Sequence, residues 1–385
     1  MVNFEFSTTK RVVSELGALT NCGLYCQQLD IHRLLIMTDK GIIQHGLIDD
    51  LRSSLAATNI THIIFDEVVA DPPQSIIEKA ARLAIENDID GIIGIGGGSS
   101  LDCAKLVAVL VKQKQSLPTM FGINNIVSSR CPLILIPTTA GTGSEVTPIS
   151  IVTTGETTKM GVVSAVLLPD IAILDANLTL GLPQHISAST GIDAMVHAIE
   201  AYTSKFKKNP YCDMLAKQAL TLLSANIEEA SLQGANLVAR QNMLLGACLA
   251  GQAFANAPVA AVHALAYPLG GHFHISHGLS NALVLPHVLR FNAQEANHLY
   301  AELIPHIFPT NALGYDESQS SERLADYFYN LSHTLELPTT LSACGIVEND
   351  LPMLAQDAML QTRLLVNNPR DVEYEDALKI YQQAL

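Results

Sequence analysis

The sequence has few of the features that mark proteins of membranes and secretion pathways. No apolar run among its 385 residues is long enough to span a bilayer, because the nearest, VVSAVLLPDIAIL, is interrupted by Pro169 and Asp170. The first residues, MVNFEFSTTK, lack the apolar segment after a basic start that defines a signal peptide. We therefore expect a cytoplasmic protein with no membrane partner.

Positive charge is also scarce. The chain holds 22 Lys and Arg residues against 37 Asp and Glu residues, which gives a formal net charge of −15. Its densest basic run, KFKK at residues 205–208, is short and fits a solvated helix end. A nucleic-acid partner is therefore not expected. With 15% charged and 48% hydrophobic residues, the composition is that of an ordinary globular protein.

The cysteines do not follow a disulfide or metal-binding pattern. There are seven, an odd number, and they are scattered along a long chain. Cys22 and Cys26 are separated by three residues, which is neither the thioredoxin nor the zinc-ribbon spacing. We expect reduced cysteines that pack in the core.

The first half of the chain alternates short apolar runs with helix-length segments. RLLIMTD, HIIFDEV, GIIGIGG and LILIPTT fit strands covered on both faces, whereas QHGLIDDLRSSLAAT and PQSIIEKAARLAIEND fit helices. This alternation predicts an α/β domain with a doubly wound parallel sheet. VVSAVLL and IAILDA are further strand candidates, at a hairpin or at a sheet edge.

Helical patterns dominate after Pro183. The segments that show them are HISASTGIDAMVHAIEAY, QALTLLSANIEEASL, LVARQNMLLGACLAGQAFA, SERLADYFYNLSHTLEL and DLPMLAQDAMLQTRLL. Since a chain of this length suits two domains, we expect an α/β domain at residues 1–184 and an all-helical domain at residues 185–385. No flexible linker separates them, so we expect the domains to pack closely with a cleft between them.

A glycine-rich segment, GIIGIGGGSSLDCAK, begins as a buried strand and ends as a helix. Its three consecutive glycines, residues 96–98, let the backbone approach a ligand closely, and Ser99 or Ser100 can cap the helix. Because the free N–H groups of a helix start bind anions, a phosphate is the expected ligand. Neither the P-loop nor the G-x-G-x-x-G spacing is present, so a tight structural turn remains an alternative.

Polar residues follow two other predicted strands. The loop TTAGTGSEVT comes after LILIP and gathers hydroxyl groups that can bind phosphate, ribose or a carboxamide; they belong to Thr138, Thr139, Thr142, Ser144 and Thr147. Asp39 ends RLLIMTD, where an acid can bind ribose hydroxyls, and it can equally cap the helix that follows. An acid at this position disfavours a 2′-phosphate and favours NAD over NADP.

Asp193 and His197 are spaced to share one face of a helix. They lie four residues apart in GIDAMVHAIEAY, so the carboxylate and the imidazole are one turn apart. Alone, such a pair is as well explained by a hydrogen bond. Glu200 lies in the same helix and ranks behind them as a ligand.

Histidines crowd the segment AVHALAYPLGGHFHISH. We expect His263 at the end of an Ala-rich helix that Pro268 and the two following glycines break, and His277 at the start of the next helix. His272 and His274 fall in an expected loop, and His287 fits a core or capping role. One Asp and three His suit Fe²⁺ or Zn²⁺, and not Mg²⁺ or Ca²⁺.

Taken together, the motifs resemble those of the iron-containing (group III) alcohol dehydrogenases. In the family's order, and over nearly the whole chain, they are TDKG at 38–41, GGGSSLDCAK at 96–105, IPTTAGTGSEVT at 136–147, TGIDAMVHAIEAY at 190–202, HALAYPLGG at 263–271, HGLSNALVLPHV at 277–288 and NNPR at 367–370. The resemblance implies an N-terminal dinucleotide-binding domain, a C-terminal helical domain, a metal in the cleft and a homodimer.

The resemblance also assigns roles to individual residues. It implies that the metal ligands are Asp193, His197, His263 and His277. It implies cofactor contacts at Asp39, Gly97, Gly98, Ser99, Thr138, Thr139, Thr147, Lys159, Leu178 and Leu182.

Two positions depart from the family pattern. Tyr267 stands where many members have a second histidine, one turn after the first, to which proton transfer or substrate positioning is assigned. A tyrosine hydroxyl can do either, but its ordinary pKa of ~10 disfavours proton transfer at neutral pH. Asp71 stands where relatives often have Asn near the cofactor, so the cofactor preference can differ.

The resulting hypothesis is a reversible alcohol dehydrogenase. A metal, Fe²⁺ or Zn²⁺, acts as a Lewis acid on the oxygen of a small alcohol, and hydride passes to NAD or NADP. Three alternatives stay open: a lyase like dehydroquinate synthase that uses NAD transiently, a reductase of another carbonyl compound, and a non-catalytic nucleotide-binding protein. The sequence does not identify the alcohol.

Overall fold

The computed structural model describes residues 3–155, 158–308 and 316–385. The chain divides into two compact units, which we call the α/β unit, Ser7–Gly181, and the helical unit, Leu182–Leu385 with residues 3–6. The N-terminal segment belongs to the helical unit because the rings of Phe4 and Phe6 pack against Tyr211. The predicted fold class, a parallel α/β domain followed by a helical domain, is confirmed.

The α/β unit is built on a six-stranded parallel sheet. In spatial order its strands are β1 (Arg11–Ser14), β9 (Ile171–Leu174), β6 (Leu133–Pro137), β4 (Gly91–Gly96), β2 (Arg33–Met37) and β3 (Thr61–Phe65). The chain runs outward from β2 to β3 and then returns to β4 on the other side of β2. The order of the strands therefore reverses between β2 and β4, and ligands of open α/β sheets bind at the carboxyl ends of the strands at such a point.

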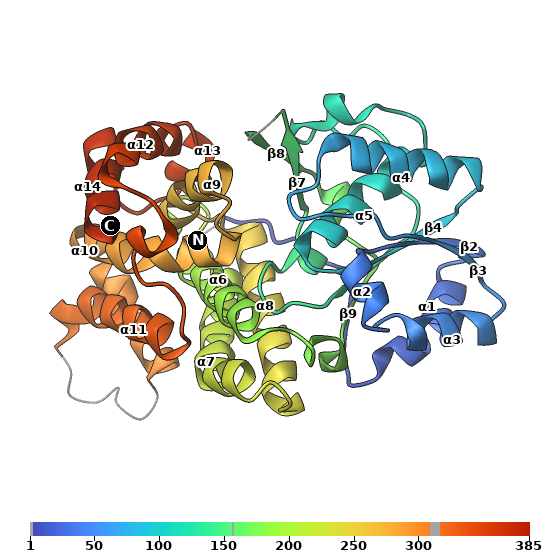
Figure 1. Cartoon of the computed structure of the whole chain (residues 1–385), viewed down its shortest axis with the longest axis horizontal. Helices are drawn as coiled ribbons and strands as arrows, with labels where there is room; N and C mark the ends of the chain where they lie inside the picture. The colour runs from blue at the N-terminus through green and yellow to red at the C-terminus, as the bar shows by residue number, and fades with distance from the viewer. Residues whose placement is uncertain (1–2, 156–157, 309–315) are drawn as a thin grey trace. The chain divides into compact units, whose positions relative to one another are not determined.

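Alternate side chains of each strand enter separate cores on the two faces of the sheet. Leu35 and Ile92 pack with helices α4 (Gln74–Glu86) and α5 (Gly98–Leu110). Ile36 and Ile93, next to them in sequence, pack with α1 (Cys22–Gln28) and α3 (Asp49–Ala57) on the opposite face (Figure 1). Because both faces are covered, the strands read as continuous apolar runs, which is why the sequence identified them.

A smaller sheet and the last two strand candidates of the first half differ from the prediction. The small sheet joins β5 (Gly122–Ile123), β8 (Thr158–Val163) and β7 (Ile149–Thr154), and the sequence did not predict it. VVSAVLL is not a strand beyond the end of β8, because Ser164 caps a short 3-10 turn over Ala165–Leu167. IAILDA forms β9, which lies inside the sheet between β1 and β6 rather than at an edge.

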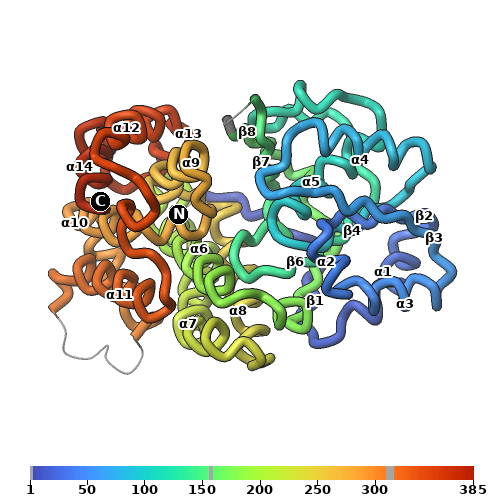
Figure 2. Tube along the Cα trace, in the orientation of Figure 1, coloured from blue at the N-terminus to red at the C-terminus, as the bar shows by residue number. Residues whose placement is uncertain are grey.

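The helical unit contains nine α-helices among its described residues (Figure 2). They are α6 (Gln184–Thr203), α7 (Pro210–Leu232), α8 (Leu237–Asn256), α9 (Ala261–Phe273), α10 (His277–Ile307), α11 (Ser320–Thr334), α12 (Leu351–Met359), α13 (Thr362–Leu365) and α14 (Tyr374–Ala384). The five segments predicted to be helical are confirmed, except that the last is divided between α12 and α13. The α/β unit also contains the short helix α2 (Lys40–Gln44).

Helix α9 differs from the prediction at both ends. His263 is its third residue rather than its last, and the helix passes through Pro268 to Phe273. A proline inside a helix removes one hydrogen bond and crowds the preceding turn. Here the turn around Pro268 is buried, and the Tyr381 hydroxyl donates a hydrogen bond of 2.6 Å to the Leu265 carbonyl. Tertiary packing thus outweighs the local preference, and the helix ends at His274 in the left-handed conformation, φ 56°.

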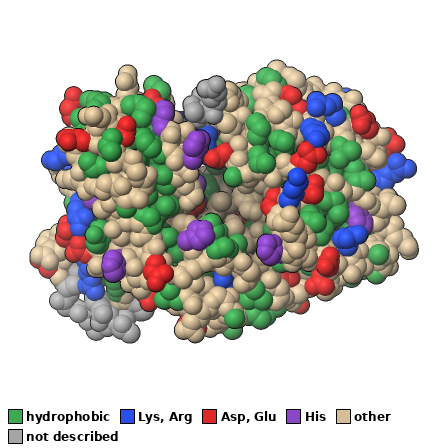
Figure 3. Space-filling view, in the orientation of Figure 1, with side chains coloured by type: hydrophobic (Ala, Val, Ile, Leu, Met, Phe, Trp, Pro, Cys, Tyr) green, Lys and Arg blue, Asp and Glu red, His purple; other side chains and the backbone are tan. Residues whose placement is uncertain are grey.

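Several charged side chains on the surface form pairs of opposite sign. Lys79 pairs with Glu67, and Arg290 pairs with Glu322. Figure 3 shows Lys and Arg side chains interspersed with Asp and Glu over the face that it draws. Such exposed pairs contribute little to stability because water screens them.

None of the helices in the described parts of the chain is by itself long and apolar enough to cross a membrane. Helices α8 and α9 would pass such a test only as a pair, by length and composition, and they are bent by 106° at their junction.

Candidate metal centre and cofactor-binding loops

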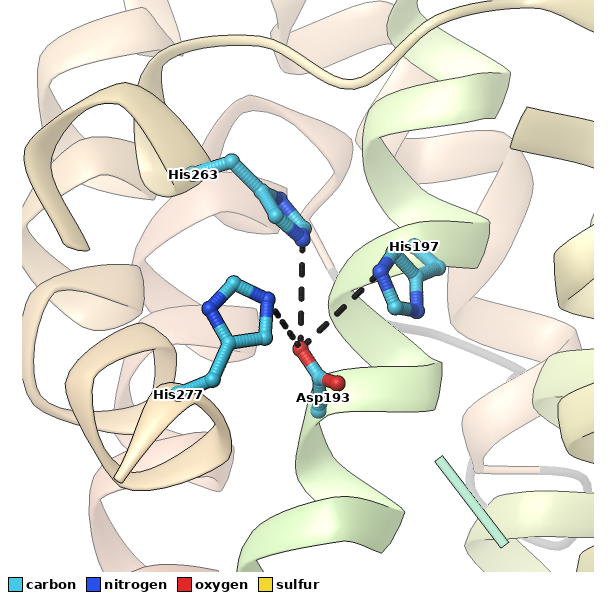
Figure 4. Close-up of side chains that lie close together, drawn as sticks. All are labelled: Asp193, His197, His263 and His277. Atoms are coloured by element: carbon cyan, nitrogen blue, oxygen red, sulfur yellow. Dashed lines mark ion pairs between the residues drawn. The ribbon is translucent and has the colours of Figure 1, made fainter. Parts of the chain in front are cut away.

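Four side chains from three helices of the helical unit converge on one point (Figure 4). Asp193 and His197 come from α6, His263 from the first turn of α9, and His277 is the first residue of α10. Each offers one donor atom, and these atoms all lie within 4.8 Å of one another. From Asp193 Oδ1 the Nε2 atoms of His197, His263 and His277 lie at 4.0, 3.9 and 3.6 Å.

Local structure explains how the three helices meet. The spacing of four residues puts Asp193 and His197 on one face of α6, as predicted. Gly278 lets α10 begin directly against α6, because a Cβ atom there would lie 2.4 Å from the Ser189 carbonyl oxygen. His277, the residue before it, is thereby held beside Asp193.

The donor set fits a divalent ion of the first transition series. A tetrahedral ion with bonds of ~2.1 Å holds its ligand atoms about 3.4 Å apart. The separations from Asp193 Oδ1 are only slightly longer, so a small inward movement would complete the coordination. Three imidazole nitrogens and one carboxylate oxygen suit iron or zinc. Asp193 and His263 are each at most 2% exposed, so the site is largely dry.

Asp193 is held in its ionised form. Burial alone would raise the pKa of this carboxyl group, but His197, His277, His263 and the side-chain amide of Asn281 outweigh it and hold the pKa below its ordinary value. The amide nitrogen of Asn281 donates to Asp193 Oδ1 at 2.6 Å. It also lies 3.3 Å from His263 Nε2 and 3.4 Å from His277 Nε2.

Glu200 contacts the cluster as a partner of a histidine rather than as a ligand. Its Oε2 atom lies 2.6 Å from His263 Nδ1, on the side of the ring opposite the converging donor atoms. Its Oε1 atom accepts a hydrogen bond of 2.7 Å from the Val262 backbone N–H. Sequence reasoning missed the parts played by Glu200 and Asn281. Their helical spacing, three residues after His197 and four after His277, was the available signal.

Phe254, Tyr267 and the other histidine candidates surround the cluster or lie away from it. The Phe254 ring stacks on His197 with centroids 4.3 Å apart, and the Tyr267 ring lies 5.9 Å from that of His277. His272 binds Asp357 of α12, and His274 ends α9. Burial and Arg290 lower the pKa of His287 to about 4, and it lies within α10 as a neutral side chain.

The glycine-rich segment and Asp39 meet at the carboxyl ends of β4 and β2. Gly96 has φ 147°, and a Cβ atom there would lie 2.7 Å from Ser100 Oγ and 3.4 Å from Asp39 Oδ2. Asp39 Oδ1 accepts a hydrogen bond from the Ile42 N–H, so the predicted helix cap is confirmed. The proposed cap at Ser99 or Ser100 is wrong, because α5 begins at Gly98 with Gly97 at its N-cap. Its first N–H groups are therefore not covered by a side-chain cap.

The loop after β6 lies against the start of α5. The Thr138 N–H donates to the Gly96 carbonyl at 2.9 Å, and a Cβ atom on Gly98 would lie 2.9 Å from Thr142 Cγ2. Thr139 is the nearest side chain to Gly97. The structure thus brings together the predicted cofactor residues of the two loops, at the point where the strand order reverses.

Four predicted cofactor residues have other surroundings. The Thr147 hydroxyl lies 3.2 Å from the Lys105 ammonium, and Lys159 pairs with Asp71 Oδ1 at 2.6 Å. Leu178 packs in the core of the α/β unit. Leu182 begins the helical unit. The cofactor contacts of these residues stay predictions.

Lys105 fastens the second loop to α5. Its ammonium group is buried and lies 2.8 Å from Ser144 Oγ and 2.7 Å from the Ile149 carbonyl oxygen. Burial lowers the pKa of Lys105, while Asp102 and Glu145 act in the opposite direction. The sequence placed Lys105 on the helix but did not indicate that it would bridge to the loop.

Comparison with known proteins identifies the family. The chain joins an α/β unit, with a glycine-rich loop at the switch point of its parallel sheet, to a helical unit that gathers three histidines and an aspartate at a candidate metal site. Residues 9–176 match the model for iron-containing alcohol dehydrogenase, and residues 187–385 match the model for the C-terminal part of the Fe-containing alcohol dehydrogenase family. The chain belongs to the iron-containing alcohol dehydrogenase family and is an oxidoreductase, which confirms the resemblance found in its motifs.

Individual relatives agree over almost the full chain. Long-chain-alcohol dehydrogenase 1 of Geobacillus thermodenitrificans is 40% identical over 376 residues, covering 96% of this chain and 93% of the relative. The solved structure of a 1,3-propanediol oxidoreductase superposes with a TM-score of 0.96 at 33% identity, covering both chains completely. That of sulfoacetaldehyde reductase from Bifidobacterium kashiwanohense in complex with NAD⁺ gives 0.88 at 25% identity, covering 100% of this chain and 99% of the other.

Proposed function

We propose that this enzyme uses a divalent metal, iron, to interconvert a small alcohol and its aldehyde or ketone with NAD as the hydride carrier. The observation that carries the proposal is the convergence of Asp193, His197, His263 and His277 on one point. The family's description as iron-containing supports the choice of metal, and zinc fits the same donors.

The residues around the point of convergence define what the protein contributes. A bound ion would act as a Lewis acid toward the substrate oxygen, and a bound nicotinamide would accept or return the hydride. Asp193 supplies a negative charge, and the three imidazoles bind as neutral nitrogens. Phe254 stacks on His197 and limits its rotation. His277 is the most exposed ligand, with 36% of its side chain accessible, so substrate approaches from its side.

NAD is the proposed cofactor because two acidic side chains lie at the carboxyl ends of β2 and β3. Asp39 lies beside Gly96, and Glu67 is bridged to Asp39 through the backbone. A 2′-phosphate would meet these acids and be repelled. The NAD⁺ complex of the related sulfoacetaldehyde reductase supports the same choice.

Tyr267 is proposed as a positioning group rather than the proton-transfer group. It lies one helical turn beyond His263 and beside the His277 ring. An ordinary phenol has a pKa of ~10 and exchanges protons poorly at neutral pH. Its ring instead narrows the space next to His277, which favours a small substrate.

The proposal extends to assembly and location. The family resemblance supports a homodimer, and sedimentation of the purified protein would test it. The scattered cysteines, which follow no disulfide pattern, support a cytoplasmic enzyme, and fractionation of cells would test that. Neither nucleic acid nor a membrane is proposed as a partner.

The central experiment replaces one ligand. His263→Ala should abolish metal-dependent NADH formation with alcohols and lower the bound iron, measured by elemental analysis of protein purified without oxygen. Binding of NADH, followed by its fluorescence, should persist because the cofactor loops belong to the other unit. His298→Ala, an exposed histidine of α10, is the control and should retain metal and activity.

The same assay separates the proposal from its alternatives. Net NADH formation from an alcohol excludes a lyase that regenerates its NAD within each turnover. Unchanged activity and iron content in the His263→Ala variant would overturn the assignment of the metal centre.

A further inference from the structure

Glu200 is a buried carboxylate that binds two neighbouring donors of helix α9. It is 3% exposed, and its two oxygens contact His263 Nδ1 at 2.6 Å and the Val262 N–H at 2.7 Å. Val262 lies in the first turn of α9, where backbone N–H groups have no partner within the helix. The N-cap residue, Ala260, has no side-chain oxygen to serve them. Glu200, from α6, therefore completes the start of α9.

The same contacts determine which nitrogen of His263 carries its proton. A carboxylate can only accept hydrogen bonds, and the Val262 N–H can only donate. His263 therefore donates from Nδ1 to Glu200, which leaves Nε2 without a proton and able to act as an acceptor or ligand. That nitrogen faces the cluster, 3.9 Å from Asp193 Oδ1. The carboxylate thus prepares the ring for metal binding before any ion arrives.

We propose that Glu200 is a positioning residue that holds His263 in the Nδ1–H tautomer and thereby sets the affinity of the centre for its metal. The inference rests on the proposed metal-dependent function and extends it beyond the four ligands. A carboxylate behind a metal-binding histidine raises the basicity of the ligating nitrogen as well as fixing the orientation of the ring.

Glu200→Gln distinguishes this role from that of a helix cap. The glutamine oxygen can still accept the Val262 N–H, so the start of α9 keeps its acceptor. Its NH₂ group then faces His263 Nδ1, which must become the acceptor, and the ring proton moves to Nε2. That proton points at the cluster and must be displaced before an ion binds.

The measurement is metal affinity of the full-length protein. After chelator treatment, Co²⁺ and Zn²⁺ are titrated against a chromophoric chelator into wild type and Glu200→Gln. We expect both ions to bind 10- to 100-fold more weakly in the variant, the effect typical of outer carboxylate partners, with an altered Co²⁺ d–d spectrum. The control is Thr203→Val, a buried change one turn further along α6 that touches no ligand, and it should bind both ions as wild type does.

Each outcome has a distinct meaning. A folded Glu200→Gln variant that binds both ions within twofold of wild type and gives the wild-type spectrum overturns the role of Glu200. Failure of the wild-type protein to bind metal overturns the proposed function itself. If Glu200→Gln does not fold, Glu200→Asp is titrated instead. This variant keeps the charge but withdraws it from Nδ1, so weakened binding supports the inference and unchanged binding refutes it.

Discussion

Glu145 makes the stability of the α/β unit depend on pH in a direction opposite to that of most carboxylates. It lies in the short 3-10 turn Ser144–Val146 and is 2% exposed. Burial raises the pKa of its carboxyl group from 4.5 to about 7, although its own backbone N–H and Lys105 act against the shift. The folded state therefore holds a proton that the unfolded chain releases at lower pH.

The sign and size of the effect follow from this shift. Below pH 4.5 the carboxyl group is protonated in both states and costs nothing. Between pH 4.5 and about 7 the unfolded chain releases this proton while the folded state keeps it, so stability falls, and above about pH 7 the folded state ionises too and the loss is complete. At about 1.4 kcal/mol per pKa unit, the rise of this pKa from 4.5 to about 7 amounts to at most about 3.5 kcal/mol, and nearly all of that stability is lost by pH 8.5.

Glu145→Gln removes the titration while keeping the shape of the side chain. We expect the variant to exceed wild type in stability by less than about 1 kcal/mol at pH 5 and by up to about 3.5 kcal/mol at pH 8.5. Denaturant unfolding at the two pH values measures the difference, and hydrogen exchange of amides in β4 and α5 assigns it to the α/β unit. An advantage of the variant that is equal at pH 5 and pH 8.5 would refute the reasoning.

Two further substitutions test the roles of Tyr267 and Asp39. Tyr267→Phe should lower kcat by less than about tenfold, because loss of a proton-transfer group costs ~100-fold or more; steady-state kinetics would show a larger loss if the hydroxyl transfers the proton. Asp39→Ser removes the charge but retains a side chain that can cap α2. The ratio of kcat/KM for NADP to kcat/KM for NAD should rise by about tenfold, equivalent to ~1.4 kcal/mol. An unchanged ratio would show that Asp39 does not determine the preference for NAD.

Features that depend on local sequence could be predicted from it. The strands β2, β3, β4 and β6 are mostly apolar because both faces of the sheet are covered, and their runs stand out in the chain. Strands β1, β7 and β8 lack that signal. β1 is mostly exposed, and β7 and β8 belong to a separate small sheet. Their pairing is decided by tertiary contacts that no short segment encodes.

The candidate site likewise has a part that could be predicted from local sequence and a part that depends on tertiary contacts. The spacing of Asp193 and His197, together with the crowding of histidines around residue 263, pointed to a shared metal site, and the structure brings those four side chains together. The path of α9 through Pro268 was predicted wrongly because its burial depends on distant helices. Glu200 became recognisable only once α9 approached α6, since its partners are 62 and 63 residues away.

The absence of a side chain at Gly278 has a consequence for engineering. A methyl group there would meet backbone atoms of Ser189, which, unlike a side chain, cannot turn aside. Even an alanine would therefore shift the first turn of α10 and displace a ligand without altering any donor atom. Libraries designed to broaden substrate range should leave this codon fixed, because clones mutated in it would be scored as poor catalysts when their defect is a misplaced helix.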